Sequence, residues 1–274
     1  MPELPEVETI RRDLADRLTG RRFAAVSATG RRSVRRYAEP AMFADELVGA
    51  RVASLDRHGK YLLIRLCADR VLVVHLRMSG QLLWHDDPTD ALQPHTHVVL
   101  DLDSCAQLRF VDPRTFGELF VSSAALPELA HFGPDALAAT AVPSTFAASL
   151  RLRRTMVKSL LLDQKFVAGI GNIYSDEILF AAGVRFDRPG ISLRRIDALR
   201  VAEATNAILT RAIAARGSTL GDAQYVDTSG AGGSFQQEHR AYGREGLPCV
   251  VCGRPITRSA FGGRSTFWCR RCQR

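Results

Sequence analysis

The sequence predicts an α+β protein of several domains, on three observations. Residues 21–121 contain short β-prone runs separated by turn residues, which is typical of a sandwich or barrel. After residue 133, apolar residues recur with the period of a helix. The chain closes with two Cys-x-x-Cys pairs, sixteen residues apart, which is the spacing of a small zinc ribbon.

Composition narrows the class of protein. The chain has 274 residues, of which 46% are apolar, enough for one large or two ordinary domains with packed cores. No apolar run is long enough for a transmembrane helix. The net charge of +8 suits a polyanion such as nucleic acid, although arginine pairs also occur on ordinary solvated surfaces. The start of the chain lacks the basic and apolar segments of a secretory signal, so we expect a cytoplasmic protein.

The first six residues contain a candidate nucleophile. A small second residue usually permits removal of Met1, which would leave Pro2 as a terminal secondary amine. The pKa of such an amine is about 7.7–8.0, so a useful fraction is neutral near neutral pH. Its attack on an aldehyde-type carbon gives a cationic iminium, and Glu3 beside it is placed to move protons. The alternative is that these residues are only an extended lead into a helix expected over residues 7–18.

The first half is expected to be a set of short strands with one inserted helix. Turn residues separate the runs. Lys60 opens one strand, where a lysine is ordinarily solvated. Cys67 and Cys105 lie in apolar contexts and are expected to be buried and reduced. The expected strands are residues 23–27, 52–56, 60–67, 71–76, 97–102, 107–110 and 118–121, with a helix at 42–47.

The second half is expected to be helical, with helices at residues 151–162, 172–182 and 193–216. Gly183 and Gly217 are the stops of the last two. Residues 219–240 are rich in small residues and are interpreted either as a mobile lid over a substrate pocket or as a linker. The predicted domains are residues 1–133, 134–240 and 241–274.

Four cysteines carry the strongest motif. Cys249, Cys252, Cys269 and Cys272 supply a full tetrahedral ligand set, so the expected zinc ion is structural and not catalytic. Two disulfides are the disfavoured alternative. Residues 255–267 between the pairs are expected to form a hairpin with Arg264 at its rim, placed to grip phosphate.

Three further motifs suggest contacts with DNA. Residues 164–177 place two glycines before a helix that begins at Asn172, which is a ready anion site. Residues 75–80 and 112–117 place Met78 and Phe116 at strand-to-turn corners. Such residues are normally part of a core, but in a DNA-binding protein they are candidates for wedges that unstack base pairs.

Together these motifs resemble the bacterial formamidopyrimidine-DNA glycosylases, which excise oxidised purines such as 8-oxoguanine. The resemblance spans the whole chain in order, from Met1-Pro-Glu-Leu-Pro-Glu through Lys60-Tyr-Leu and the corner motifs to the terminal cysteines. It implies an N-terminal β-sandwich with flanking helices, a helix–two-turns–helix domain, a four-cysteine zinc finger and one structural Zn²⁺. It also implies a monomer that binds damaged double-stranded DNA and acts in the bacterial nucleoid.

The resemblance implies a role for each matching residue. Pro2 attacks C1′ of a nucleotide flipped out of the duplex, and β- then δ-elimination cuts the strand. Glu3 is the acid, and Lys60 donates protons and contacts phosphate. Arg264 holds phosphates and assists the second elimination. The implied DNA contacts are Asn172, Met78, Arg114, Phe116, His95, Arg153 and Lys158, and residues 219–240 would cover the everted base.

Two alternatives stay open. One is a glycosylase of the endonuclease VIII type, which removes oxidised pyrimidines; relatives of that type usually begin Pro-Glu-Gly-Pro, so Leu4 favours the purine branch. The other is a non-catalytic DNA-binding paralogue with a zinc finger. Thr115 departs from the pattern, because many members have an arginine there, and Arg153 lies in a basic run that leaves its alignment uncertain by a few residues.

Overall fold

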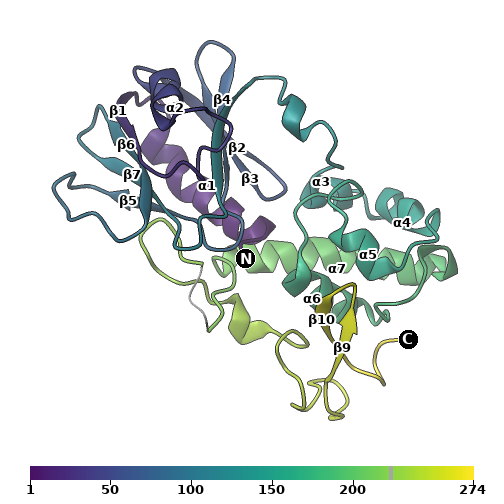
Figure 1. The fold of residues 1–274 in the computed structure, drawn as a ribbon. Coiled ribbons are helices and arrows are strands. Elements are labelled where there is room, and N and C mark those ends of the chain that lie inside the picture. The colour runs from purple at the N-terminus through teal and green to yellow at the C-terminus, as the bar shows by residue number, and fades with distance from the viewer. Residues whose placement is uncertain (222–224) are drawn as a thin grey trace. The chain divides into compact units, whose positions relative to one another are not determined.

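The computed structural model describes residues 1–221 and 225–274, which form two compact units (Figure 1). The N-terminal unit comprises residues 1–131 and 215–234, and the C-terminal unit comprises 132–214 and 235–274. The division predicted from the sequence, at 133/134 and 240/241, stays a prediction. Among the described helices, none combines the length and the apolar content that crossing a bilayer requires.

Two antiparallel four-stranded sheets make the N-terminal unit a β-sandwich, as predicted. One sheet has the order β1-β6-β7-β5 and the other has the order β2-β3-β4-β8. Near-continuous burial along β3 and β4 places these central strands within the core, whereas the edge strand β2 buries Val52 and Leu55. The strands are β1 (Phe23–Ala28), β2 (Val52–His58), β3 (Tyr61–Leu66), β4 (Arg70–His75), β5 (Gln81–His85), β6 (Thr96–Leu102), β7 (Gln107–Val111) and β8 (Glu118–Ser123).

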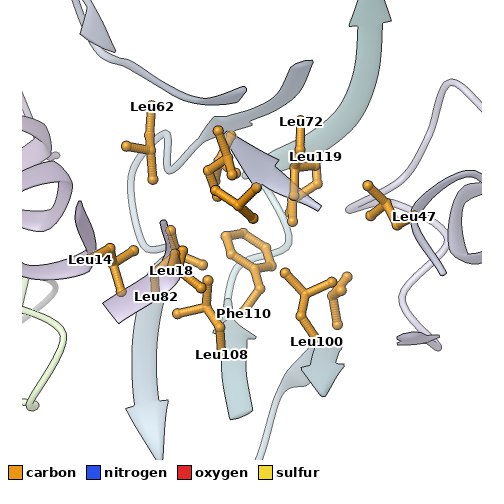
Figure 2. Packing of buried hydrophobic residues seen from close by; sticks show 14 of the residues in the cluster. Leu14, Leu18, Leu47, Leu62, Leu72, Leu82, Leu100, Leu108, Phe110 and Leu119 are labelled. Carbon is orange, nitrogen blue, oxygen red and sulfur yellow. The ribbon is translucent and has the colours of Figure 1, made fainter. Parts of the chain in front are cut away.

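Helix α1 (Leu4–Leu18) closes the core and carries the start of the chain. Its apolar residues recur at helical spacing, so a single face is buried. Leu14 and Leu18 from this face meet Leu82 and Phe110 of the sandwich in one apolar cluster (Figure 2). A short helix, α2 (Pro40–Leu47), packs beside β1 through Phe43 and Leu47. The core therefore fixes α1, and α1 fixes the residues just before it.

Some expectations for this unit were wrong. Strand β5 was not predicted, because it has only five residues and polar residues follow it directly. Cys67 and Cys105 are exposed and not buried. Cys67 directly follows β3, and its backbone N–H donates a hydrogen bond to Arg51 O. Cys105 lies in a turn with φ 63°. Both cysteines thus lie where the chain leaves the sheet, so the apolar neighbours enter the core and the cysteines do not.

The C-terminal unit is helical up to residue 214. Helix α6 has the predicted bounds and ends at Gly183 in the left-handed conformation, φ 69°. Helix α7 is confirmed within two residues at each end. The helices are α3 (Ala136–Thr140), α4 (Pro143–Arg151), α5 (Val157–Leu162), α6 (Asn172–Ala182) and α7 (Arg195–Ala214).

The helix expected over residues 151–162 was wrong in its first half. The structure has a loop at residues 152–156, and α5 begins only at Val157. The first amide groups of α5 bond to a neighbouring loop: Val157 N donates to Arg188 O (2.8 Å) and Lys158 N donates to Phe186 O (3.1 Å). These tertiary bonds satisfy the donors that an earlier helical turn would otherwise have used.

The C-terminal segment contains the predicted hairpin, β9 (Thr257–Phe261) and β10 (Arg264–Trp268). Gly262 and Gly263 have φ 54° and 73°, a pair that a two-residue hairpin turn of type I′ requires. Strand β10 runs alongside α6 in the same direction. Asn172 at the start of the helix contacts Ser265, and Gly183 at its end contacts the last residues of the chain.

Replacing Phe110 by alanine should destabilise the protein by about 3–5 kcal/mol, because its ring is 1% exposed at the centre of the sandwich. Urea unfolding followed by circular dichroism measures the change. Leu92→Ala is the control: Leu92 is 61% exposed, and its loss should cost less than about 0.5 kcal/mol. Equal costs for the two variants would contradict the described core.

Candidate functional site

Pro2 and Glu3 are held rigidly at the start of α1. Both are buried, whereas Met1 is 44% exposed. Glu3 is the N-cap of the helix and forms a capping box with Glu6: Glu3 N donates to Glu6 Oε2 at 2.8 Å. Two helix-terminal amides are satisfied in this way. The candidate amine therefore lies at the end of an ordered backbone, not on a frayed tail.

Glu6 also binds the segment that follows α7. Its Oε1 accepts a hydrogen bond from Ser218 N at 2.8 Å. Gly217, the neighbour of Ser218, has φ +80°, and a Cβ there would lie 2.7 Å from the Glu6 carboxylate. A side chain at position 217 would collide with Glu6, so glycine is needed for both reasons. One buried carboxylate thus ties the start of the chain to residues 217–218.

Lys60 is positioned by a chain of hydrogen bonds from α1. Arg57 Nε donates to Glu8 Oε2 (3.1 Å), and Arg57 Nη1 donates to the carbonyl of Gly59 (3.0 Å). Gly59 and Lys60 form the two-residue turn between β2 and β3, so Lys60 lies just before the strand that it was expected to open. Lys60 is only 8% exposed. The relay from Glu8 to Arg57 fixes this turn to the helix that carries Pro2.

The electrostatics around Lys60 keep a nearby histidine neutral. Burial, together with the positive charges of Arg77 and Lys60, lowers the pKa of His75 to about 3. Its Nδ1 accepts a hydrogen bond from Arg77 N at 2.9 Å, which fits a neutral ring. The ring of Tyr61 packs edge-on against it at 4.3 Å. His75 is therefore a packing partner of the Lys60 turn and no proton donor at neutral pH.

Asp112 brings the two predicted corner motifs together. Its buried carboxylate accepts hydrogen bonds from Ser79 Oγ (2.5 Å) on one corner and from Gly117 N (2.6 Å) and Arg114 N (3.2 Å) on the other. Met78 and Phe116 are 40% and 39% exposed, so neither belongs to the core. Satisfying a buried carboxylate with several donors fixes a loop firmly.

The loops joined by Asp112 carry a group of exposed residues, called here the surface cluster. The Arg114 guanidinium lies 4.8 Å from the centroid of the Phe116 ring, a cation–π contact. His95 is exposed with φ 66°, and its carbonyl accepts a hydrogen bond from Asp112 N at 3.0 Å. The structure therefore brings together four predicted DNA contacts, Met78, Arg114, Phe116 and His95.

In the C-terminal unit, Asn172 and Lys158 face the zinc hairpin. Asn172 Nδ2 donates to Ser265 O at 2.9 Å. Lys158 has no exposed surface, and its ammonium pairs with Asp176 (2.6 Å) and contacts Thr266 Oγ1. The other carboxylate oxygen of Asp176 accepts from Phe267 N at 2.9 Å. Lys158 thus holds β10 against α6, and its ammonium does not reach the surface as a direct DNA contact would require.

Arg264 and Arg153 are both exposed, on different segments of the C-terminal unit. Arg264 is the first residue of β10, directly after the Gly262–Gly263 turn. Its guanidinium has no ion pair among the residues that the structure describes. Arg153 lies in the loop between α4 and α5, with its guanidinium 5.8 Å from the Phe166 ring centroid. Both can reach a phosphate without breaking an existing pair.

The four cysteines form a metal site. Their Sγ atoms all lie within 4.8 Å of one another, with Cys249 and Cys272 3.8 Å apart and Cys252 and Cys269 3.5 Å apart. A tetrahedral zinc ion with Zn–S bonds of about 2.3 Å requires sulfur separations of about 3.8 Å. The donors fit one structural Zn²⁺, as predicted, and the separations exclude disulfides.

The segment expected to cover the everted base is only partly described. Residues 222–224 lie outside the described residues. In the remainder, the carboxylate of Asp227 accepts bonds from Ser229 N and Ala231 N, and Trp84 N of β5 donates to Thr228 O at 2.8 Å. Residues 225–234 therefore have fixed contacts with the sandwich, and their role as a lid stays a prediction.

Sequence reasoning missed the residues that position the site. Glu6, Glu8, Arg57 and Asp112 touch no expected substrate atom, yet they hold Pro2, Lys60 and the corner loops. Their signal was a charged residue inside an otherwise apolar or catalytic motif, as in Glu6 and Glu8 on the buried face of α1. A buried charge is rare unless it is paired, so such positions point to a structural partner.

Family models match almost the whole chain. Residues 1–119 match the formamidopyrimidine-DNA glycosylase N-terminal domain, and residues 132–224 match the formamidopyrimidine-DNA glycosylase H2TH domain. Residues 246–274 match a zinc finger found in FPG and IleRS.

Curated and solved relatives agree over the full length. The formamidopyrimidine-DNA glycosylase of Moorella thermoacetica is 46% identical over 94% of both chains, and that of Salinispora arenicola is 45% identical over 100% of this chain and 96% of its own. The crystal structure of MutM (Fpg) from Thermus thermophilus is 40% identical with a TM-score of 0.85, covering 99% and 98% of the two chains. Lactococcus lactis Fpg bound to DNA containing N7-benzyl-Fapy-dG is 32% identical with a TM-score of 0.89, covering both chains completely.

Glu8→Gln should remove stability that depends on pH. Burial alone would raise the pKa of Glu8. Hydrogen bonds from Arg11 and Arg12 and the charge of Arg57 outweigh this effect and lower the pKa of Glu8 from 4.5 to about 2. The carboxylate therefore stabilises the fold fully above about pH 4.5, and this stabilisation is lost as the pH falls towards 2. Because solvent screens the exposed arginine partners, we expect a loss of about 2 kcal/mol at pH 7 and about half of that at pH 3.

Urea unfolding of both proteins at pH 3, 5 and 7 measures this difference. Glu39→Gln is the control, because Glu39 is 66% exposed and its pair with Arg31 is exposed to solvent as well. Its effect should stay below about 0.5 kcal/mol at every pH. A gap between wild type and Glu8→Gln that is the same at pH 3 and pH 7 would show that the ion pairs do not act as described.

Cys269→Ser should release the metal and disorder the hairpin, because binding at a four-thiolate site is coupled to folding. Metal content per chain, measured by mass spectrometry after gel filtration, should fall from one zinc to none. Cys67→Ser is the control, since Cys67 is an exposed free cysteine of the other unit and its loss should leave zinc bound. Full zinc content in Cys269→Ser would refute the assignment.

Proposed function

The chain belongs to the formamidopyrimidine-DNA glycosylase family, and we propose that it uses Pro2 as the nucleophile of its reaction. It is a base-excision-repair glycosylase with the family's abasic-site lyase activity. Its partner is double-stranded DNA that carries damaged bases or abasic sites. We further propose that oxidised purines are its main substrates and that it acts in the bacterial cytoplasm, on the nucleoid, as a monomer.

The observation that carries the assignment is the anchored start of α1. A nucleophile must be held within reach of one carbon atom, and such orientation supplies a large part of a rate enhancement. Pro2 is followed directly by a capped helix whose apolar face is buried to 0–1% exposure. Removal of Met1 would leave the Pro2 nitrogen as a secondary amine at a fixed position.

The proposed reaction proceeds through a covalent intermediate. The Pro2 nitrogen attacks C1′ of the damaged nucleotide, and the C1′–base bond breaks as the base takes up a proton. The C1′–O4′ bond then opens as O4′ takes up a proton, which leaves an iminium between C1′ and the Pro2 nitrogen. This iminium withdraws electrons from C2′, so a proton leaves C2′ and the 3′ phosphate departs. A second elimination then releases the 5′ phosphate. Glu3, one residue from the nitrogen, is the proposed proton carrier.

The remaining site residues are proposed to hold the DNA. Lys60, on the turn fixed by Arg57, is proposed to donate protons and bind a phosphate. Asn172, at the N-terminus of α6, and Arg264, at the tip of the hairpin, are proposed phosphate contacts, since helix N-termini and guanidinium groups both suit phosphate. Arg153 is a proposed contact as well.

The surface cluster of Met78, Arg114, Phe116 and His95 is proposed to act on the duplex itself. Exposed Met and Phe side chains on rigid corners are suited to fill the space that an everted nucleotide leaves. Arg114, stacked on Phe116, is placed to donate hydrogen bonds to the opposite base. Lys158 is proposed to act indirectly, by holding β10 and hence Arg264 in position.

Pro2→Gly should still bind DNA but lose at least about 100-fold of base excision, because a flexible primary amine replaces a rigid secondary one. The measurement is borohydride trapping on an oligonucleotide with an abasic site, which links active protein covalently to DNA. Pro40→Gly makes the same change at the start of α2, away from the site, and should trap as well as wild type. Peptide mapping that places the adduct on another residue would overturn the proposal.

The lesion class is tested by cutting duplexes with 8-oxoguanine opposite cytosine and with thymine glycol, side by side. We expect cutting of the purine lesion to be faster by at least about tenfold, roughly the discrimination that a few pocket contacts supply. The comparison matters because Lactococcus lactis Fpg has been solved with DNA containing an oxidised pyrimidine. Faster cutting of thymine glycol would favour the endonuclease VIII type of activity. Trapping without any cutting of either base would restrict the enzyme to abasic sites.

A further inference from the structure

A basic hollow, called here the second basic hollow to distinguish it from the proposed lesion site, lies in the C-terminal unit. None of the residues assigned a role above lines it. It has a volume of about 710 Å³, and it is lined by the loop after α6 and by the last residues of the chain. Four arginines line it and one acid does. They are Arg185, Arg188, Arg270, Arg274 and Asp187.

The positive charge of this hollow is not fully compensated. Arg185 pairs with Asp187, and Arg188 pairs with Asp197. Arg270 and Arg274 are exposed, and neither guanidinium has an ion pair within the described residues. Two free guanidinium forks at one rim are suited to hold phosphate oxygens by paired hydrogen bonds.

The walls of the hollow are already rigid. Arg274 N donates to Gly183 O, and Arg274 O accepts from Arg185 N (3.1 Å) and from Arg188 Nη1 (3.0 Å). The buried side chain of Gln273 donates to Val184 O and accepts from Cys269 N. These bonds join the loop after α6 to the end of the chain. A site built in advance loses little entropy on binding.

An aromatic wall completes the hollow. Trp268 packs edge-on against Phe186 at 5.5 Å, and its indole donates to Ser259 Oγ at 3.0 Å. The Arg185 guanidinium lies 5.3 Å from the Trp268 ring centroid. The contact with the Trp268 ring thus helps to hold the Arg185 guanidinium in place.

The hollow lies at the opposite end of two elements from the proposed phosphate contacts. Asn172 begins α6, and Arg185 follows its end; Arg264 begins β10, and Trp268 ends it. An eleven-residue helix spans about 16 Å. Phosphates bound at Asn172 and Arg264 therefore cannot occupy the hollow at the same time.

We propose that this hollow binds phosphates of a second, undamaged DNA segment while the first site holds the lesion. The proposal rests on the chain's being a DNA-binding protein, but on none of the catalytic assignments. Contact with a second duplex would let the protein pass between DNA segments without a free intermediate. Affinity would be modest, about 10⁻⁴–10⁻⁶ M, as for other sequence-independent contacts with phosphates.

The test uses the full-length protein saturated with a short duplex that contains a tetrahydrofuran abasic analogue. A fluorescent undamaged duplex is then added, and its anisotropy reports binding at the second site. Arg270→Ser with Arg274→Ser should weaken this binding at least about fivefold, and the slope of log affinity against log salt should fall by about two, roughly one for each lost phosphate contact.

The matched control is Arg254→Ser with Arg271→Ser, which removes the same charge from exposed positions of the zinc finger that do not line the hollow. It should change second-site binding by less than about twofold, since only the screened net charge differs. Zinc content and affinity for the first duplex should be unchanged in both double variants. Failure of the first duplex to bind wild type would refute the proposed function. Binding of the undamaged duplex alone, compared between wild type and the two double variants, would still decide whether the hollow holds DNA phosphates.

Three results would overturn the inference. In the first, the saturated wild type does not bind a second duplex. In the second, the two double variants weaken second-site binding equally, so that only net charge matters. In the third, wild type binds pyrophosphate, the double variant Arg270→Ser with Arg274→Ser does not, and the second duplex fails to compete with pyrophosphate. The hollow would then be a site for a free phosphate compound and not for DNA.

Discussion

The carboxylate of Glu6 is the contact on which the reacting end of this protein depends. It accepts hydrogen bonds from the backbone of Glu3 and of Ser218, two residues that lie far apart in the sequence. A carboxylate with 1% exposure costs several kcal/mol unless its oxygens are satisfied, so the fold and the position of residue 3 are secured together. Any movement of the N-terminus away from the sandwich leaves a buried charge without its donors. The energy that orients Pro2 therefore comes from folding and not from substrate binding.

The same device recurs wherever a loop carries a proposed contact. Asp112 joins the two corner loops, Asp176 holds β10, and Glu177 accepts the amides of residues 240–242 at the entry to the zinc finger. Each buried carboxylate collects backbone donors that a loop cannot satisfy within itself. The residues proposed to meet the DNA, such as Phe116, are thereby left exposed on a rigid support. Structure and contact are divided between different residues, and substitutions in the two groups have different consequences.

Arginine serves two purposes in this chain. Arg57 and Arg216 are engaged in ion pairs within the N-terminal unit: Arg57 links Glu8 to the turn of Lys60, and Arg216 links Asp13 to Asp227. Arg264, and Arg270 and Arg274 of the second basic hollow, are exposed and have no acidic partner in the described chain. Net charge alone does not separate these groups, since only the second releases counterions when DNA binds. We therefore expect the affinity of the protein for DNA to be set by a minority of its arginines.

By itself the sequence determined the elements whose signals are local. The period of apolar residues predicted α6 and the strands other than β5, and the cysteine spacing predicted the zinc site, because ligand geometry and helix period act over a few residues. Only the tertiary structure decided where α5 begins, that Lys158 is buried against Asp176, and that Cys67 is exposed. Those outcomes depend on which distant segment lies next to each residue. The donors of α5 are satisfied by residues 186–188, and Lys158 is covered by β10, far along the chain. No local pattern encodes such a neighbour, because it is chosen by the packing of the whole unit.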